Sequence, residues 1–347
     1  MKKMKAIVKI KPGFGNTEFQ EVDIPKIKNN EVLVKIKTVS ICGTDVHIYN
    51  WDKWAENRIK TPLIYGHEFA GDVVEIGKDV TYVKVGDYVS AEGHIACNYC
   101  YQCRTGFAHV CEKSKILGVD INGIFAEYAS IPESNIWKNN KNLSYELASI
   151  QDPLGNAIHT VFSADVPGRK VAIFGCGPIG LMCISICKAI GASSIIAIGR
   201  KNEYRLNLAK QLGAHLVLKS DENLIDNIFK ETEGHGVDIV LEISGSNTAV
   251  NQGLKILRTG GSIYLLGIYT EKTSLDLSED VVFKYINIKG INGRLMYDTW
   301  YRMAGLLESG NLNIEPIITH KFKFDEFQKA MDTMRSGNCG KVVMYME

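Results

Sequence analysis

Residues 170–180 read KVAIFGCGPIG, and this stretch decides the fold of the central part of the chain. A short apolar run, Lys170–Phe174, leads into glycines spaced as G-x-G-x-x-G, and Leu181–Ile190 then has helical spacing. After a strand, such glycines permit a tight turn, close approach of the backbone to a pyrophosphate, and helix–strand contact. The helix amino terminus then faces the phosphates. The predicted dinucleotide-binding residues of this turn are Gly175, Gly177, Ile179 and Gly180.

Apolar segments alternate with helical ones on the carboxyl-terminal side of this turn. An amphipathic helix is predicted over Lys201–Leu212. Short strands are predicted at Ser194–Ile198, His215–Leu218, Val237–Ile243 and Gly261–Leu266. Strands that alternate with helices indicate βαβ units, so we predict an α/β fold with a parallel, doubly wound sheet.

The two ends of the chain have a different texture. The first third contains short strands of alternating charged and apolar residues at Lys5–Lys9, Glu31–Val39, Gly71–Ile76 and Asp87–Ser90, typical of a β-rich, partly closed barrel. After Tyr297 the pattern predicts helices at Trp300–Ser309 and Asp325–Ser336 and strands at Pro316–His320 and Lys341–Tyr345. We therefore predict one domain from residues 1–155 and 296–347, with a dinucleotide-binding domain of residues 156–295 inserted into it.

The composition is that of a globular protein. Of the 347 residues 45% are apolar, and 40 Lys and Arg balance 39 Asp and Glu, which argues against nucleic acid or an anionic membrane as partner. No apolar run approaches the roughly 18 residues of a membrane helix, and the charged start is not a signal-peptide core. Nine cysteines cannot all pair within the chain, so the cytoplasm is the expected compartment.

Four of the nine cysteines lie close together in sequence, as Cys97-x2-Cys100-x2-Cys103-x7-Cys111. Four thiolates at short spacing can wrap one zinc ion tetrahedrally and leave no position for substrate. The alternatives are idle cysteines and an iron–sulfur cluster, whose bacterial spacing ends in x3-Cys-Pro. Here the last gap is seven residues and Glu112 follows, which favours structural zinc.

A second set of metal-binding residue types is dispersed. Cys42 precedes Gly43-Thr44-Asp45, and His67-Glu68 follows Gly66. Thiolate, imidazole and carboxylate together suit a catalytic zinc that keeps one position open. A single buried cysteine usually belongs to the hydrophobic core, and a single histidine usually forms its hydrogen bonds within the fold. Their combination with the cysteine-rich lobe and the glycine turn is specific.

In this order, Cys42-Gly43-Thr44-Asp45-x-His47, Gly66-His67-Glu68, the cysteine lobe and the glycine turn resemble the zinc-containing medium-chain alcohol dehydrogenases over essentially the whole chain. The resemblance implies a GroES-like catalytic domain beside a Rossmann domain, two zinc ions per chain and a homotetramer. Further stretches resemble the branch that oxidises the secondary hydroxyl of L-threonine: residues 50–54, 92–94, 152–156, 299–301, 316–320 and 335–337. The open alternatives are a polyol or secondary-alcohol dehydrogenase and a catalytically silent zinc protein.

The resemblance also implies roles for individual residues. Cys42, His67 and Glu68 would hold a zinc ion that acidifies the substrate hydroxyl, and Asp152 would either ligate it or orient His67 from outside. The Thr44 hydroxyl would touch the reacting oxygen, and His47 would pass the proton to solvent. The residues predicted to shape the substrate pocket are Trp51 and His94, with core packing as the alternative for Trp51.

The cofactor prediction depends on the tip of the second strand, Gly199-Arg200-Lys201. It lacks the acid that usually accepts the adenosine ribose hydroxyls, while Gly199 leaves room and the Arg200 guanidinium suits a phosphate, which favours NADP. The alternative is a solvated Arg–Lys pair with NAD, the usual cofactor of the family that the chain resembles. Arg205 supports either choice. Other candidate cofactor contacts are Leu266, Gly267, Ile268, Ile291 and Asn292, and Arg294 is a candidate partner for an anionic group.

Overall fold

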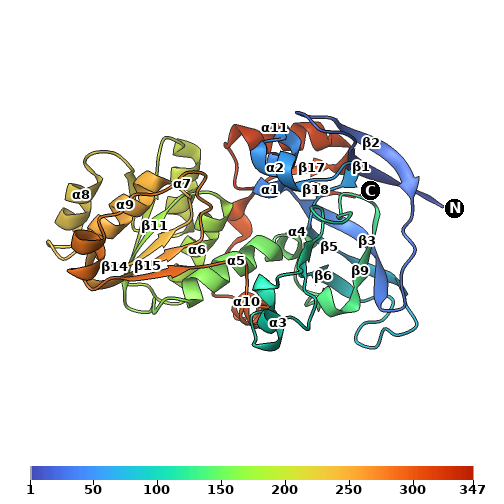
Figure 1. Cartoon of the computed structure of the whole chain (residues 1–347), viewed down its shortest axis with the longest axis horizontal. Coiled ribbons are helices and arrows are strands. Elements are labelled where there is room, and N and C mark those ends of the chain that lie inside the picture. Colours follow the sequence, from blue (N-terminus) through green and yellow to red (C-terminus); the bar gives the residue numbers. More distant parts are fainter. Residues whose placement is uncertain (1, 347) are drawn as a thin grey trace. The chain divides into compact units, whose positions relative to one another are not determined.

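The computed structural model describes residues 2–346, and the chain divides into two compact units (Figure 1). Unit 1 extends to Asp152 and resumes at Ile318, and unit 2 is Pro153–Ile317. Residues 153–155 and 296–317 thus group with unit 2, whereas the sequence prediction assigned them to the first domain. The reason is local packing, since Arg302 of α10 (Asp298–Glu308) stacks on Phe162 of α5 (Gln151–Phe162), 5.3 Å from the ring centre.

Unit 2 is built on a six-stranded sheet in which every neighbouring pair is parallel. The strand order is β13 (Leu216–Lys219), β12 (Ser194–Gly199), β11 (Lys170–Phe174), β14 (Val237–Glu242), β15 (Leu257–Leu265) and β16 (Asn287–Gly290). Numbered from the glycine turn this is 3-2-1-4-5-6, the doubly wound Rossmann order. The predicted parallel sheet is confirmed.

Helices pack against the strands of this sheet (Figure 1). They are α6 (Pro178–Ala189), α7 (Glu203–Leu212), α8 (Leu224–Glu231) and α9 (Asn247–Ile256). Helix α7 begins where Asn202 accepts a hydrogen bond from the Arg205 amide and ends at Gly213, whose φ of 113° favours glycine. Helices α8 and α9 were not predicted from the sequence.

Unit 1 contains a mixed seven-stranded sheet in which the last strand of the chain has a neighbour on each side. Its order is β10 (Ile136–Lys138), β6 (Tyr88–Ala91), β5 (Glu68–Ile76), β3 (Glu31–Ser40), β18 (Lys341–Tyr345) and β17 (Ile318–Lys323), with β9 (Tyr128–Pro132) also on β3. A smaller sheet joins β2 (Thr17–Asp23), β1 (Lys3–Lys9) and β4 (Leu63–Ile64), and β7 (His94–Ile95) pairs with β8 (Lys115–Ile116). The strand β18 therefore lies directly beside β3.

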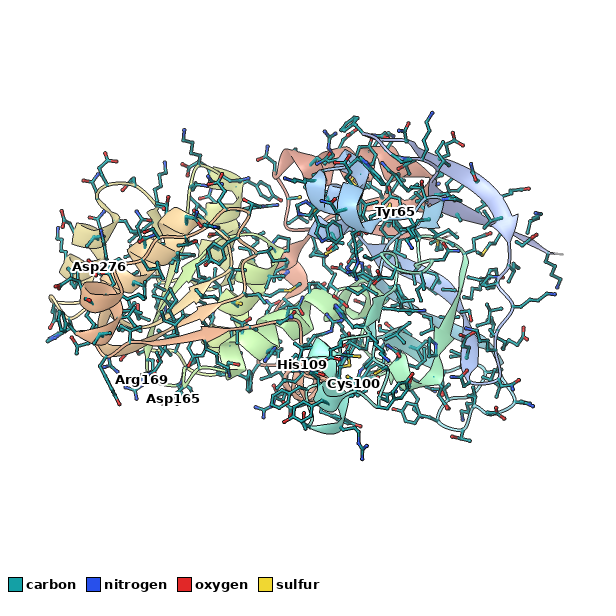
Figure 2. The ribbon with its side chains drawn as sticks, in the orientation of Figure 1. Tyr65, Cys100, His109, Asp165, Arg169 and Asp276 are labelled. Atoms are coloured by element: carbon teal, nitrogen blue, oxygen red, sulfur yellow. The ribbon has the colours of Figure 1, made fainter. Side chains whose placement is uncertain are left out.

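The helices of unit 1 are short, and the strands carry most of its core. They are α1 (Gly43–Asn50), α2 (Lys53–Arg58), α3 (Tyr101–Arg104), α4 (Tyr145–Ser149) and α11 (Phe327–Ser336). Tyr65, labelled in Figure 2, is fully buried and packs against Phe125 and Phe327 at 5.4 and 5.9 Å between ring centres. Of the helices within residues 2–346, each is too short or too polar to cross a lipid bilayer.

Candidate functional site

Three side chains from separate parts of the sequence meet at one point in unit 1. Cys42 caps the amino end of α1, while His67 and Glu68 stand where β5 begins. The Cys42 sulfur, one His67 ring nitrogen and one Glu68 carboxylate oxygen all lie within 4.8 Å of one another. The antiparallel pairing of β3 with β5 causes this, because it sets Ser40 opposite Glu68 and so brings the chain after β3 beside the start of β5.

One carboxylate oxygen of Glu68 is neutralised by the protein itself. Oε2 accepts hydrogen bonds from the Lys341 ammonium and the Ser40 hydroxyl. The Lys341 side chain is only 2% exposed, and its ammonium also donates to the Ile41 carbonyl at 2.9 Å. Sequence analysis missed Lys341, although a lysine at the head of an apolar strand was a usable signal. The other oxygen, Oε1, is buried and has no hydrogen-bond partner within residues 2–346.

The surroundings of His67 favour a positive charge. Asp45 is fully buried, and its carboxylate accepts the Cys42 amide at 2.8 Å. Burial raises the pKa of Asp45 to about 6, against the opposing effect of His67. Burial also acts to lower the pKa of His67, but Cys42, Asp45 and Asp152 outweigh it and raise that pKa to about 10. A divalent cation at this point would be stabilised by the same charges.

The donor set fits a catalytic zinc ion. It offers one sulfur, one nitrogen and one oxygen, and both His67 Nδ1 and Glu68 Oε1 are buried without a hydrogen-bond partner in the described chain. Asp152 lies outside the group of three whose donor atoms are mutually within 4.8 Å, but its charge acts on His67. Both predicted roles of Asp152, ligation of the metal and orientation of His67, stay predictions.

The two predicted relay residues lie on α1. Thr44 Oγ1 is 3.7 Å from the Cys42 sulfur, so its hydroxyl is beside the proposed metal position. His47 Nδ1 is hydrogen-bonded to Asp52 Oδ2. The other oxygen of Asp52 caps α2 by accepting the amides of Trp54 and Ala55 at 3.1 and 3.0 Å. Asp52 was not singled out by the sequence analysis as a partner of His47.

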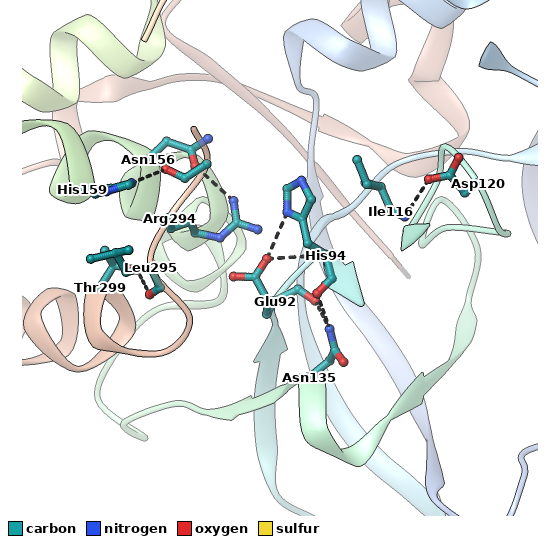
Figure 3. A network of polar contacts seen from close by, with 11 residues as sticks. Glu92, His94, Ile116, Asp120, Asn135, Asn156, His159, Arg294, Leu295 and Thr299 are labelled. Carbon is teal, nitrogen blue, oxygen red and sulfur yellow. Dashed lines mark hydrogen bonds and ion pairs between the residues drawn. The ribbon is translucent and has the colours of Figure 1, made fainter. Parts of the chain in front are cut away.

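Trp51 and His94, the predicted pocket residues, are both held firmly in unit 1. Trp51 follows α1 with a φ of 55° and packs against the hydrophobic core. The Lys9 ammonium lies over its indole ring, 5.1 Å from the ring centre. Glu92 is 1% exposed, and its Oε1 accepts the amide and the Nδ1 of His94 at 3.0 and 3.1 Å (Figure 3). Asn135 donates to the carbonyls of both Glu92 and His94. The role of Trp51 and His94 in binding substrate stays a prediction.

The four clustered cysteines converge as expected for one ion (Cys100 is labelled in Figure 2). Their sulfurs lie within 4.8 Å of one another. Cys100 Sγ is 3.5 Å from Cys103 Sγ and 3.8 Å from Cys111 Sγ, close to the edge of about 3.8 Å that a tetrahedron with 2.3 Å zinc–sulfur bonds requires. Backbone amides point at the sulfurs, for example that of Cys97 at Cys111 Sγ, 3.3 Å. Cys97, Cys100, Cys103 and Cys111 therefore fit structural zinc.

In unit 2, the glycine turn has the geometry that its sequence predicts. Gly175 has a φ of 99°, and Gly177 is the N-cap of α6, with Ile179 in its first turn. A Cβ added at Gly180 would overlap the Gly175 carbonyl oxygen, so only glycine fits. At Gly177 the nearest atom to an added Cβ is Arg205 Nη1, at 4.0 Å. The backbone there is open to an approaching phosphate, and Arg205 lies next to it.

The tip of β12 is tightly packed on one side and exposed on the other. A Cβ at Gly199 would meet Leu206 Cδ2 at 2.8 Å and Cys176 Sγ at 3.6 Å. Arg200 is exposed. An acid at position 199 would therefore displace Leu206, while the Arg200 guanidinium is accessible to a ligand.

The remaining predicted cofactor contacts lie at the carboxyl edge of the same sheet. The amides of Leu266 and Gly267 donate to the Glu242 carbonyl at 2.9 and 3.1 Å, and the amide of Ile291 donates to Leu265. Ile268, 89% exposed, and Asn292 are the accessible members of the group. Arg294 is buried within unit 2, and its Nη1 donates to Asn156 Oδ1 at 3.2 Å (Figure 3).

Two family models match the chain, one in each unit. Residues 28–141 match the alcohol dehydrogenase GroES-like domain, and residues 178–309 match the zinc-binding dehydrogenase model. The L-threonine 3-dehydrogenase of Bacillus licheniformis is 52% identical, over 98% of both chains. The chain belongs to the zinc-binding dehydrogenase family. The predicted GroES-like and Rossmann folds are thereby confirmed.

Other zinc-binding dehydrogenases resemble the chain over nearly its full length. The L-threonine 3-dehydrogenase of Caldanaerobacter subterraneus subsp. tengcongensis is 55% identical over 93% of both chains. A solved structure of a putative zinc-binding dehydrogenase from Sinorhizobium meliloti, bound to NADP, has a TM-score of 0.91 at 27% identity. It covers 99% of this chain, and this chain covers all of it.

Proposed function

We propose that this dehydrogenase oxidises the secondary hydroxyl of L-threonine to 2-amino-3-oxobutanoate. The observation that carries the proposal is the assembly of Cys42, His67 and Glu68 within 4.8 Å, in a chain 52% identical to an L-threonine 3-dehydrogenase. The reaction removes a hydride from C3 of threonine and a proton from its hydroxyl. A nicotinamide ring takes the hydride, and the proton leaves to solvent.

The predicted site residues of unit 1 would each have a part in this reaction. Cys42, His67 and Glu68 would hold a zinc ion, a Lewis acid that makes an alcohol more acidic. Thr44 Oγ1, beside Cys42, would accept the hydrogen bond of the substrate hydroxyl and fix its orientation. His47 would carry the proton outward, since its side chain is 59% exposed. His94, fixed by Glu92, would contact the polar groups of the substrate.

A second zinc ion would stabilise the lobe of Cys97, Cys100, Cys103 and Cys111. The sulfur–sulfur distances support this assignment, and the thiolates leave no position for a substrate. None of the nine cysteines, all of which lie within the described residues, forms a disulfide. Free thiols at such spacing support a reducing compartment such as the cytoplasm.

For the cofactor, we favour NADP over NAD. The Arg200 guanidinium is exposed at the tip of β12, where a 2′-phosphate would form charge-assisted hydrogen bonds. A side chain at Gly199 would have to move Leu206, so the acid that would repel such a phosphate is absent from this position. Arg205, beside Gly177, would bind the pyrophosphate with either cofactor.

The expected homotetramer has one supporting feature in unit 2. The strand β16 forms an edge of the six-stranded sheet, and all four of its residues are exposed. Apolar side chains beside it are exposed as well, with Phe283 at 71% and Tyr285 at 80%. An uncovered apolar edge is a suitable surface for self-association. Light scattering on I288K beside the unmodified protein tests this, since a charged edge should dissociate the assembly.

The decisive test of function is a substrate panel with zinc-loaded protein. L-threonine should have a higher kcat/KM than 2,3-butanediol, sorbitol or 2-propanol, measured with NAD and NADP side by side. Higher activity on a diol or polyol would reject threonine as the substrate. A complete lack of cofactor reduction with every alcohol would favour a non-catalytic zinc protein.

A further inference from the structure

We propose that Asp52 is a positioning residue that fixes the tautomer of His47. The inference rests on the proposed function, because it assumes that His47 carries the proton of the substrate. Asp52 is neither one of the proposed zinc ligands nor part of the glycine turn. The basis of the inference is a pair of helix ends that meet in unit 1.

Asp52 has two oxygens with different partners, and the local fold keeps them distinct. It is the N-cap of α2, and Oδ1 accepts the amides of Trp54 and Ala55 at 3.1 and 3.0 Å. These two bonds fix the rotation of the carboxylate. Oδ2 is then directed at His47 Nδ1, one turn earlier in the chain. The Trp54 ring stands edge-on to the imidazole, 6.1 Å between ring centres, and limits its rotation further.

A carboxylate can only accept a hydrogen bond, so its partner nitrogen must carry a proton. Neutral His47 therefore holds its hydrogen on Nδ1 and presents a bare Nε2, the nitrogen able to take a proton. Burial acts to raise the pKa of Asp52, but its bonds from Ala55 and His47 outweigh it and keep the pKa below its ordinary value. Asp52 is therefore ionised when the relay operates.

The variant D52N separates this role from the capping role. Asparagine caps a helix about as well as aspartate, so its Oδ1 keeps the bonds to Trp54 and Ala55. The amide nitrogen then faces His47 Nδ1 as a donor, which forces the hydrogen of the imidazole onto Nε2. A control of the same chemistry is D120N, because Asp120 accepts the Ile116 amide at 2.9 Å and pairs with Arg58 at 2.8 Å rather than with a histidine.

The first experiment reads the tautomer directly. In zinc-loaded, full-length protein labelled with nitrogen-15 histidine, two-bond proton–nitrogen spectra at about pH 8.5, two units above the ordinary imidazole pKa near 6.5, show which ring nitrogen carries hydrogen. The resonances of His47 are assigned by their loss in H47Q. We expect Nδ1–H in the unmodified protein and in D120N, and Nε2–H in D52N. Nδ1–H retained in D52N overturns the proposal.

The second experiment is a double-mutant cycle on kcat/KM for L-threonine. D52N should lower kcat/KM by about 10²- to 10⁴-fold, the contribution of a positioned general base, with its zinc content and Tm unchanged. In an H47Q background D52N should have no further effect. An equal loss in both backgrounds means that Asp52 acts other than through His47, and overturns the proposal. If the unmodified protein oxidises another alcohol but the tautomer still follows Asp52, the threonine assignment fails and the positioning role stands.

Discussion

The substitution K341M should show that a lysine and a zinc ion compete to neutralise Glu68. Methionine keeps much of the lysine stem but removes the ammonium that bonds Glu68 Oε2 and the Ile41 carbonyl. The pair is buried, with side-chain exposures of 2% and 0%. Removing one partner of such a pair costs about 3–5 kcal/mol, because it leaves an uncompensated charge in the interior. For a unit of this size, 3 kcal/mol corresponds to a Tm lowered by about 6–12 °C.

The size of this loss should depend on the metal. In zinc-loaded protein the ion itself compensates the carboxylate, so the fall in Tm of K341M should be smaller than in metal-free protein. The two effects form a closed thermodynamic cycle. If zinc recovers 1.4 kcal/mol of the loss, zinc must bind K341M about tenfold more tightly than the unmodified protein.

Calorimetry on metal-free and zinc-loaded samples measures the first quantity, and competition with a zinc chelator measures the second. The matched control is K321M on the neighbouring strand β17, where Lys321 is 54% exposed and pairs with Glu146. An exposed pair contributes about 0–1 kcal/mol, so its Tm should scarcely change with or without metal. Equal losses of Tm for K341M in both states, or weaker zinc binding, would refute the compensation of Glu68 by Lys341.

Three further predictions concern other parts of the molecule. G180A should lower the Tm of unit 2 because its Cβ overlaps the Gly175 carbonyl, whereas G177A should leave Tm unchanged and weaken NADPH binding in a fluorescence titration. R200A should lower kcat/KM with NADP about 10- to 100-fold, the effect of one charged hydrogen bond, and leave that with NAD nearly unchanged; equal losses with both would argue against a 2′-phosphate contact. E146Q should be less stable than the unmodified protein in urea at pH 7 but not near pH 2. Burial acts to raise the pKa of Glu146, yet its bonds from Tyr345 and Lys321 lower it to about 2 from the ordinary 4.5, so its contribution is present above 4.5 and is lost as pH falls through about 2.

Much of the architecture follows from local sequence signals. The segment Lys170–Phe174 forms β11 with the predicted bounds, and the glycine turn follows it with the predicted geometry. Helices α8 and α9 were missed although both are amphipathic, and neither Asn223 nor Ser246 makes a side-chain cap bond. Sequence periodicity detects a helix by the repeat of its apolar residues, and helices of eight and ten residues contain few repeats.

The metal ligands could be predicted because each motif is contiguous in sequence. The residues that form hydrogen bonds with those ligands could not. Ser40 and Lys341 meet Glu68 through sheet pairing, and the sequence separation between Lys341 and Glu68 is 273 residues. Asp52 is close to His47 in sequence, but its bond depends on the rotation that the α2 cap imposes on its carboxylate. Local patterns thus identify donor types, while the charge balance around them depends on contacts that no short pattern contains.

The metal site of unit 1 is assembled from segments that lie far apart in the chain. The strand β18 is inserted between β3 and β17, and Lys341 bonds the Ile41 carbonyl across 300 residues of chain. Such pairing is entropically costly in an unfolded chain, but unit 2 lies within that loop and shortens it by folding on its own core of Phe174, Val240 and Leu254. The Lys341 ammonium is brought to Glu68 by the pairing of β18 with β3. The charge environment of Cys42, His67 and Glu68 is therefore completed by Lys341 of the last strand, 273 residues from Glu68 in sequence.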